Sequence, residues 1–218
     1  MANSFKTLLT EDVATTRTLL HEAIPITGTI VSGTYLSDAN IKTFSHGMFE
    51  AVYDYPYLSS SANHIFDITA GFADVSQLSA SDDATHVQNA KKINIYNQMA
   101  QQLVGYDITG GIKHFDFNGE KSSFECFFVN FGRLLTKDEV KKDSFRWSLY
   151  TTGTNPLDKG TRGGSRTIGD YGAATQYYTD SPVGEYALLL TSSTAHNEHA
   201  IGHIYYQAGI VVLTASIF

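Results

Sequence analysis

The sequence predicts an α+β fold, in which two amphipathic helices near residues 38–54 and 83–104 pack on a mixed or antiparallel sheet. An antiparallel β-sandwich-like region follows from about Asp143 to the C-terminus. Three observations predict this fold class. Two segments carry apolar residues at helical spacing, an Asn118-Gly119 pair lies between two strand-like segments, and the last residues form the most apolar hairpin of the chain.

The whole-chain composition limits the classes of function. The formal net charge of −7 argues against non-specific nucleic-acid binding, which depends on Lys and Arg. Only 17% of the residues are charged, and such a polar but lightly charged surface is typical of proteins that pack against other proteins. No apolar run approaches the ~20 residues of a membrane span, and the N-terminus lacks the apolar stretch of a signal peptide.

The first 22 residues are expected to form a partly helical arm that docks on a neighbouring subunit or on its own domain. Apolar residues recur there at mostly helical spacing, but several threonines disfavour a complete helix. The arm supplies five candidate interface residues, Phe5, Leu8, Leu9, Leu19 and Leu20. An extended segment is expected over residues 24–35, with Pro25 at its beginning, where its missing N–H does least harm.

The first predicted helix begins at Ser37 or Asp38, either of which is a suitable N-cap, and ends before Pro56. Its apolar residues are Ile41, Phe44, Met48, Phe49 and Val52. Three tyrosines follow, and they are either a platform for a sugar or core and interface residues with outward hydroxyls. The second role is the more common one, so we treat them as interface candidates: Tyr53, Tyr55 and Tyr57.

A short strand over residues 64–69 precedes the second predicted helix, which runs from about Asp83 to Val104 and stops at Gly105. A hairpin follows, with strands over 112–117 and 122–131 on either side of the Asn118-Gly119 turn. The single cysteine, Cys126, lies in the return strand and is expected to be an inert core thiol. Residues 136–139 form a capping-box pattern that opens one helical turn.

The C-terminal region is predicted to be all-β. Strands are expected around 145–150, 167–172 and 186–191, with a Gly- and Thr-rich loop over 151–166. The final hairpin places Ile204 and Tyr206 on one face of its first strand and continues, after Gly209, into a buried strand over 210–213. The two apolar residues at the terminus are expected in the fold or at a subunit contact: Ile217 and Phe218.

Several clusters of polar residues are candidates for chemical sites. The best metal candidates are His196, His199 and His203 with a nearby glutamate, but their spacing matches no known zinc motif and a solvated loop is the preferred interpretation. The segment 161–166 lacks the spacing, the Lys-Ser/Thr pair and the following helix of a phosphate loop. No nucleophile motif is present, although a glycosidase carboxylate pair is assembled by the fold and leaves no local pattern. We therefore expect no enzyme activity, no cofactor and no metal.

Larger stretches of the chain resemble a family of virion structural proteins from large contractile-tailed phages, notably phages of marine cyanobacteria. The resemblance covers most of the chain, from about Thr27 to Phe218, and implies a virion location rather than a mechanism. It rests on the segments 27–38, 40–42, 45–49, 52–69, 94–100, 134–145 and 202–214.

A looser likeness is to β-sandwich modules of tail and baseplate proteins. Their pattern has an Ile/Val-Lys-x-Gly-Ser-x strand, later followed by an Asp-x-Gly turn and a Gly-x-Ile-x-Tyr-x-x-Gly hairpin. The matching segments here are 140–145, 170–172 and 202–209. The chain departs from the pattern at Asp143, where the modules prefer Gly, and this leaves the turn there open.

Two classes of function remain. The first is a virion structural protein, made in the host cytoplasm, that binds other virion proteins and copies of itself in the tail, baseplate, neck or fibre-attachment region. It would have no sequence-specific nucleic-acid partner and no membrane partner. The alternative is a virion-borne adhesin or hydrolase that acts on glycans of the host surface. For either class the expected organisation is an arm over residues 1–22, an α+β region over 23–142 and a β-rich region over 143–218, where the last two can form one compact domain.

Overall fold

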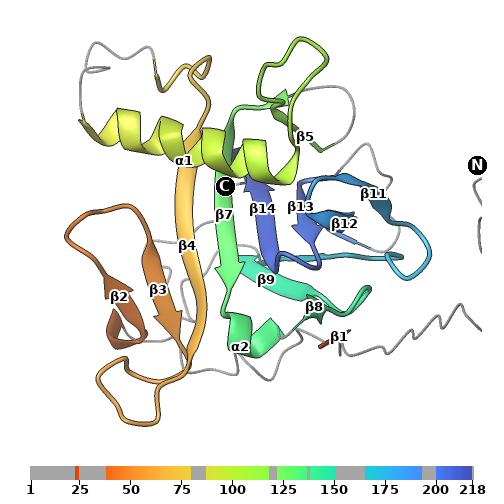
Figure 1. Ribbon diagram of the computed structural model, residues 1–218. Coiled ribbons are helices and arrows are strands. Elements are labelled where there is room, and N and C mark those ends of the chain that lie inside the picture. The colour runs from red at the N-terminus through yellow and green to blue at the C-terminus, as the bar shows by residue number, and fades with distance from the viewer. Residues whose placement is uncertain are drawn as a thin grey trace, which may run out of the picture.

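The computed structural model describes residues 23–24, 38–79, 87–117, 122–136, 138–150, 165–192 and 200–217. Its centre is an eight-stranded sheet in which every neighbouring pair is antiparallel (Figure 1). The strand order across the sheet is β11 (Tyr178–Ser181), β12 (Gly184–Leu189), β13 (Gly202–Tyr205), β14 (Ile210–Thr214), β7 (Glu125–Phe131), β4 (His64–Phe72), β3 (Glu50–Tyr53) and β2 (Ile41–Thr43).

The last strand of the chain, β14, lies in the middle of this sheet between β13 and β7. Side chains alternate between the two faces of a strand, so each strand contributes to two layers of core. Val211 and Leu213 join one buried cluster, while Ile210 and Val212 join the other. Strand β7 divides its residues in the same way, which shows that both faces of the central sheet are covered.

Helix α1 (Val87–Leu103) covers one face and lies across β4 and β7 (Figure 1). The buried residues Tyr96, Ala100 and Leu103 recur at helical spacing on its inner side. The hydroxyl of Tyr96 donates to the carbonyl of Ser123 at 2.7 Å and accepts from the amide of Phe115 at 3.2 Å. These bonds attach the short hairpin β5 (Phe115–Asp116) and β6 (Ser122–Ser123) to the helix.

The opposite face is covered by the two-stranded sheet of β9 (Arg146–Tyr150) and β10 (Ser165–Gly169). The buried residues Phe145 and Ile168 bring this pair into the same cluster as Val211. The second layer gives the C-terminal half a sandwich-like character. Nearby, β8 (Glu139–Val140) pairs in parallel with β1 (Ala23–Ile24), and α2 (Arg133–Thr136) is a single short helical segment.

The predicted pair of amphipathic helices is wrong. Residues 38–54 form a 3₁₀ turn η2 (Asp38–Asn40) followed by β2 and β3, so the fold is mostly antiparallel sheet with α1 as the single long helix of the described residues. Gly47 adopts a positive φ of 63° in the turn between the two strands, which interrupts a helix. Strand β3 then pairs with β4 along its whole length, and this pairing outweighs the helical spacing of the apolar residues.

Other predicted elements are observed. The helix predicted over 83–104 is observed as α1 from Val87 to Leu103, residues 83–86 lie outside the described residues, and Gly105 follows the helix with a φ of 87°. The final hairpin is confirmed in position and in the division of its faces, with Gly209 at a φ of 66°. The helical turn expected from Thr136 onward is wrong, because Thr136 ends α2 and β8 begins at Glu139. Strand β14 also pairs directly with β7, so residues before and after Asp143 share one sheet.

Candidate functional site: an aromatic cavity beside the final hairpin

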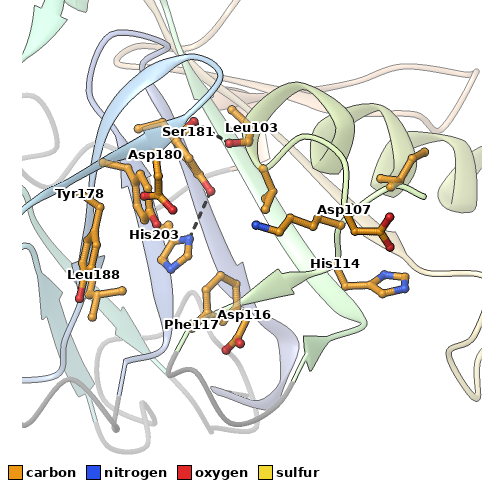
Figure 2. A pocket seen from close by; sticks show the side chains of 15 residues that line it. Leu103, Asp107, His114, Asp116, Phe117, Tyr178, Asp180, Ser181, Leu188 and His203 are labelled. Carbon is orange, nitrogen blue, oxygen red and sulfur yellow. Dashed lines mark hydrogen bonds between the residues drawn. The ribbon is translucent and has the colours of Figure 1, made fainter. Parts of the chain in front are cut away.

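A cavity of about 590 Å³ opens at the β11 side of the sheet. Its wall combines the end of α1, the segment from Asp107 to Phe117, and strands β11, β12 and β13. The hydroxyl of Ser181 donates to the carbonyl of Leu103 at 2.6 Å and so ties the end of β11 to the end of the helix. Figure 2 shows His203, Asp180 and Phe117 gathered around this space.

A row of three tyrosines crosses one wall of the cavity. Tyr178, Tyr186 and Tyr205 are direct cross-strand neighbours on β11, β12 and β13, which puts their rings next to one another. The rings of Tyr178 and Tyr186 stack at 5.2 Å between centroids, and those of Tyr186 and Tyr205 stack at the same distance. Burial raises the pKa of Tyr186 and of Tyr205 above the usual range, so both phenols stay protonated.

His203 lies at the back of the cavity, two residues before Tyr205 on the same face of β13. Its Nδ1 is 3.2 Å from the hydroxyl of Tyr205, and its ring meets the edge of Phe117 at 4.8 Å between centroids. Burial lowers the pKa of His203 to about 3, with only partial opposition from the charge of Asp180, so the imidazole is neutral at physiological pH. Its buried Nε2 has no hydrogen-bond partner among the described residues.

Charged groups line the rest of the cavity. Asp116 and Asp180 supply carboxylates, and Lys113 supplies an ammonium group. Asp107 is engaged in its own turn, where it accepts hydrogen bonds from the amides of Thr109 and Gly111 at 2.8 and 2.9 Å. The cavity therefore combines flat aromatic surfaces with acceptors and donors, which is the composition of a site for a small polar ligand.

A second candidate surface lies at the other end of the sheet, on the hairpin of β2 and β3. The rings of Phe44 and His46 stack in parallel at 5.1 Å, and Phe49 lies 5.0 Å from each of them. Met48 and Phe49 are 39% and 37% exposed. We call Phe44, His46, Met48 and Phe49 the β2–β3 surface. Two hollows of about 260 Å³ each continue from it toward β4 and α1.

The residues predicted as sites fall in different places. His203 is in the cavity, while His196 and His199 lie outside the described residues. The described part of the chain contains no group of three or more His, Cys, Asp and Glu side chains placed to hold a metal. Cys126 is buried, and burial raises the pKa of its thiol to about 12, which agrees with the expected inert core residue.

The predicted interface residues are only partly described. Tyr55 and Tyr57 are exposed, and Tyr53 is half-buried against Tyr57 and His64. Ile217 belongs to the 3₁₀ turn η4 (Ala215–Ile217), although its side chain is not described. The remaining interface candidates lie outside the described residues, namely Phe5, Leu8, Leu9, Leu19, Leu20 and Phe218.

The tyrosine row and its carboxylates are not among the residues predicted as sites from the sequence. The available signal was Tyr178-Thr179-Asp180 followed by Pro182-Val183-Gly184 and Glu185-Tyr186, which is a strand, a turn and a second strand. Gly184 has a φ of 104° in that turn, as a hairpin glycine often does. The hairpin of β11 and β12 could therefore be predicted from the sequence. The position of Asp116 across the cavity could not be predicted in this way.

Comparison of the chain with protein-family models, curated proteins and solved structures finds no match in any of the three. No helix within the described ranges is both long enough and apolar enough to cross a membrane.

Proposed function

We propose that this chain is a structural protein of a phage virion, which works by binding copies of itself and other virion proteins. The resemblance of residues 27–218 to virion proteins of contractile-tailed phages supports the virion location. The tail, the baseplate, the neck and the fibre attachments are the candidate places. The observation that carries the proposed mode of action is the exposed aromatic cluster of the β2–β3 surface.

The β2–β3 surface has the composition and the order of a protein-binding surface. Aromatic residues and Met are enriched in the buried centres of interfaces, and both are present here. The three rings support one another, so little side-chain freedom remains to be lost on binding. The hollows beside them give a partner side chain a place to enter, and Ile95 and Met99 of α1 line one of the two.

The position of this surface also supports a contact with another subunit. Strand β2 is at the edge of the eight-stranded sheet, at the opposite end from β11 (Figure 1). It has only three residues, and Lys42 is at its middle. Short and charged edge strands limit uncontrolled strand pairing, so recognition here would depend on the adjacent side chains rather than on sheet extension.

The test compares how much wild-type chain and how much Phe49→Ser variant is incorporated into phage particles during infection. The amount of the chain in purified virions is measured by mass spectrometry. Wild-type chain should be found in the particles, and Phe49→Ser should reduce its incorporation at least tenfold while the purified variant still melts cooperatively. Ile108→Ser is the matched control, because Ile108 is fully exposed on a loop away from the β2–β3 surface. Absence of the wild-type chain from purified virions would refute the virion role. Equal incorporation of both variants would refute the role of the surface.

A further inference from the structure

We infer that the cavity beside the final hairpin is a binding site for a neutral saccharide, held by the tyrosine row, His203 and the carboxylates of Asp116 and Asp180. The inference goes beyond an assembly role. The cavity involves β11, β12 and β13, whereas the β2–β3 surface is at the far end of the sheet. The two sites are therefore separable by mutation.

The buried nitrogen of His203 is the first reason to place a ligand here. His203 is only 5% exposed and is one of the residues that line the cavity, and its buried Nε2 has no hydrogen-bond partner among the described residues. Buried polar atoms are nearly always satisfied, so an unpartnered one beside a cavity points to a group that enters from outside. A sugar hydroxyl both donates and accepts, so it would satisfy Nε2 in either tautomer of the neutral ring.

The aromatic wall is the second reason. Sugar rings present apolar C–H faces, and these pack against flat aromatic surfaces while the hydroxyls point outward. Tyr178 is 40% exposed at the open end of the row, and its ring is held in place by stacking on Tyr186. A rigid and partly exposed tyrosine gives contact area at a low entropic cost.

The charges of the lining select the ligand class. Asp116 and Asp180 would repel a phosphate or an acidic sugar, and they accept hydrogen bonds well from hydroxyl groups. A simple cation would use the carboxylates but would leave the ammonium group of Lys113 opposed by a like charge. A neutral polyhydroxylated ligand uses both kinds of group. The volume of about 590 Å³ falls within the range of small-molecule sites.

The test is binding of the intact chain to a printed array of neutral, acidic and amino oligosaccharides, followed by calorimetry with the strongest neutral trisaccharide. The wild-type chain should bind neutral members of the array, and Tyr178→Ala should weaken the calorimetric affinity at least tenfold. Tyr177→Ala is the matched control, because Tyr177 is 41% exposed and is the preceding residue, yet it does not line this cavity. It should bind like wild type.

Failure to bind any neutral glycan, or preference for acidic or amino glycans, would overturn the inference. An equal loss in Tyr178→Ala and Tyr177→Ala would also overturn it, because the tyrosine row would then not be the site. The Phe49→Ser variant separates failure of the saccharide site from failure of the assembly role. It should keep full glycan affinity while its incorporation into particles falls.

Discussion

The hydroxyl of Tyr206 donates a 2.9 Å hydrogen bond to Oδ2 of Asp170, and both residues are completely buried. Asp170 also accepts from the amides of Asp143 and Phe145 at 2.6 and 2.9 Å, and from Nη1 of Arg146 at 2.9 Å. Burial raises the pKa of Asp170, and these hydrogen bonds oppose the rise. The carboxyl group of Asp170 thus joins the turn of the final hairpin, the end of β10 and the start of β9.

The first prediction concerns this junction. Tyr206→Phe removes one donor to Asp170 and leaves the ring in the core, so it should lower the free energy of unfolding by about 1–3 kcal/mol. Urea unfolding measures the change. Tyr177→Phe is the control on an exposed ring and should stay within about 0.5 kcal/mol of wild type. Equal stability of the two variants would show that the Asp170 junction contributes little.

The second prediction concerns the approach of α1 to β4. A Cβ at Gly71 would lie 2.9 Å from the backbone nitrogen of Tyr96 and 3.0 Å from the carbonyl oxygen of Lys92. Gly71→Ala should therefore push the helix outward and cost about 1–3 kcal/mol in the same assay. Gly111→Ala is the control, because the atoms nearest its added Cβ belong to the exposed side chain of Asp107, at 3.1 Å or more, rather than to a packed backbone. Wild-type stability of Gly71→Ala would contradict the close packing of α1.

The third prediction is a pH dependence of stability from His203. Burial holds its pKa at about 3 in the folded chain, against an ordinary value of 6.5, so only the unfolded chain takes up this proton between those values. The resulting stability is fully present above about pH 6.5 and is lost as the pH falls, at up to about 1.4 kcal/mol per pH unit.

Urea unfolding of wild type and His203→Gln between pH 7.5 and 4.5 isolates this contribution, because the other titrating groups are common to both chains. The wild-type chain should lose more stability on acidification than the variant does. Parallel pH profiles would mean that His203 is not held neutral by the fold.

The fourth prediction concerns the last strand. Removal of residues 210–218 deletes β14 from between β13 and β7, and so divides the sheet and exposes two strand edges. The truncated chain should aggregate and show no cooperative melt. A chain that lacks only residues 217–218 keeps β14 and should melt cooperatively. Cooperative melting of the longer truncation at the wild-type temperature would refute the central place of β14.

The fifth prediction concerns the N-terminal arm, which lies outside the described residues. Removal of residues 1–22 should leave a folded domain with near wild-type melting, because the apolar residues of the arm are expected to serve a subunit contact rather than the core. The same chain should fail to enter particles, since the apolar residues of the arm are expected to contact a neighbour. Normal incorporation of the shortened chain would remove the arm from the list of contacts.

Local patterns predicted the elements whose residues carry their own signal. The final hairpin followed from alternation around Gly209, and α1 followed from helical spacing that ends at Gly105. Asp143 was the place where the likeness to sandwich modules failed, and it has a φ of 59°, the conformation a glycine would adopt there.

The rest depended on pairing between distant segments. Ile41, Phe44, Met48 and Val52 have helical spacing, yet the segment is a hairpin because β3 pairs with β4. The cavity is assembled from the end of α1, from residues 107–117 and from three neighbouring strands, so no local pattern marks it. Among the lining residues, the sequence marks only His203 as a site candidate, and it does so as a metal ligand rather than as part of an aromatic cavity.

The most direct test of the assembly role is a reconstruction of the intact phage particle at a resolution that traces side chains. The account predicts density for this chain in several symmetry-related copies, with Phe49 and Met48 buried against a neighbouring subunit. A particle that contains the chain with the β2–β3 surface open to solvent in every copy would contradict the proposed contact. A complete particle without density for the chain would contradict the structural role itself.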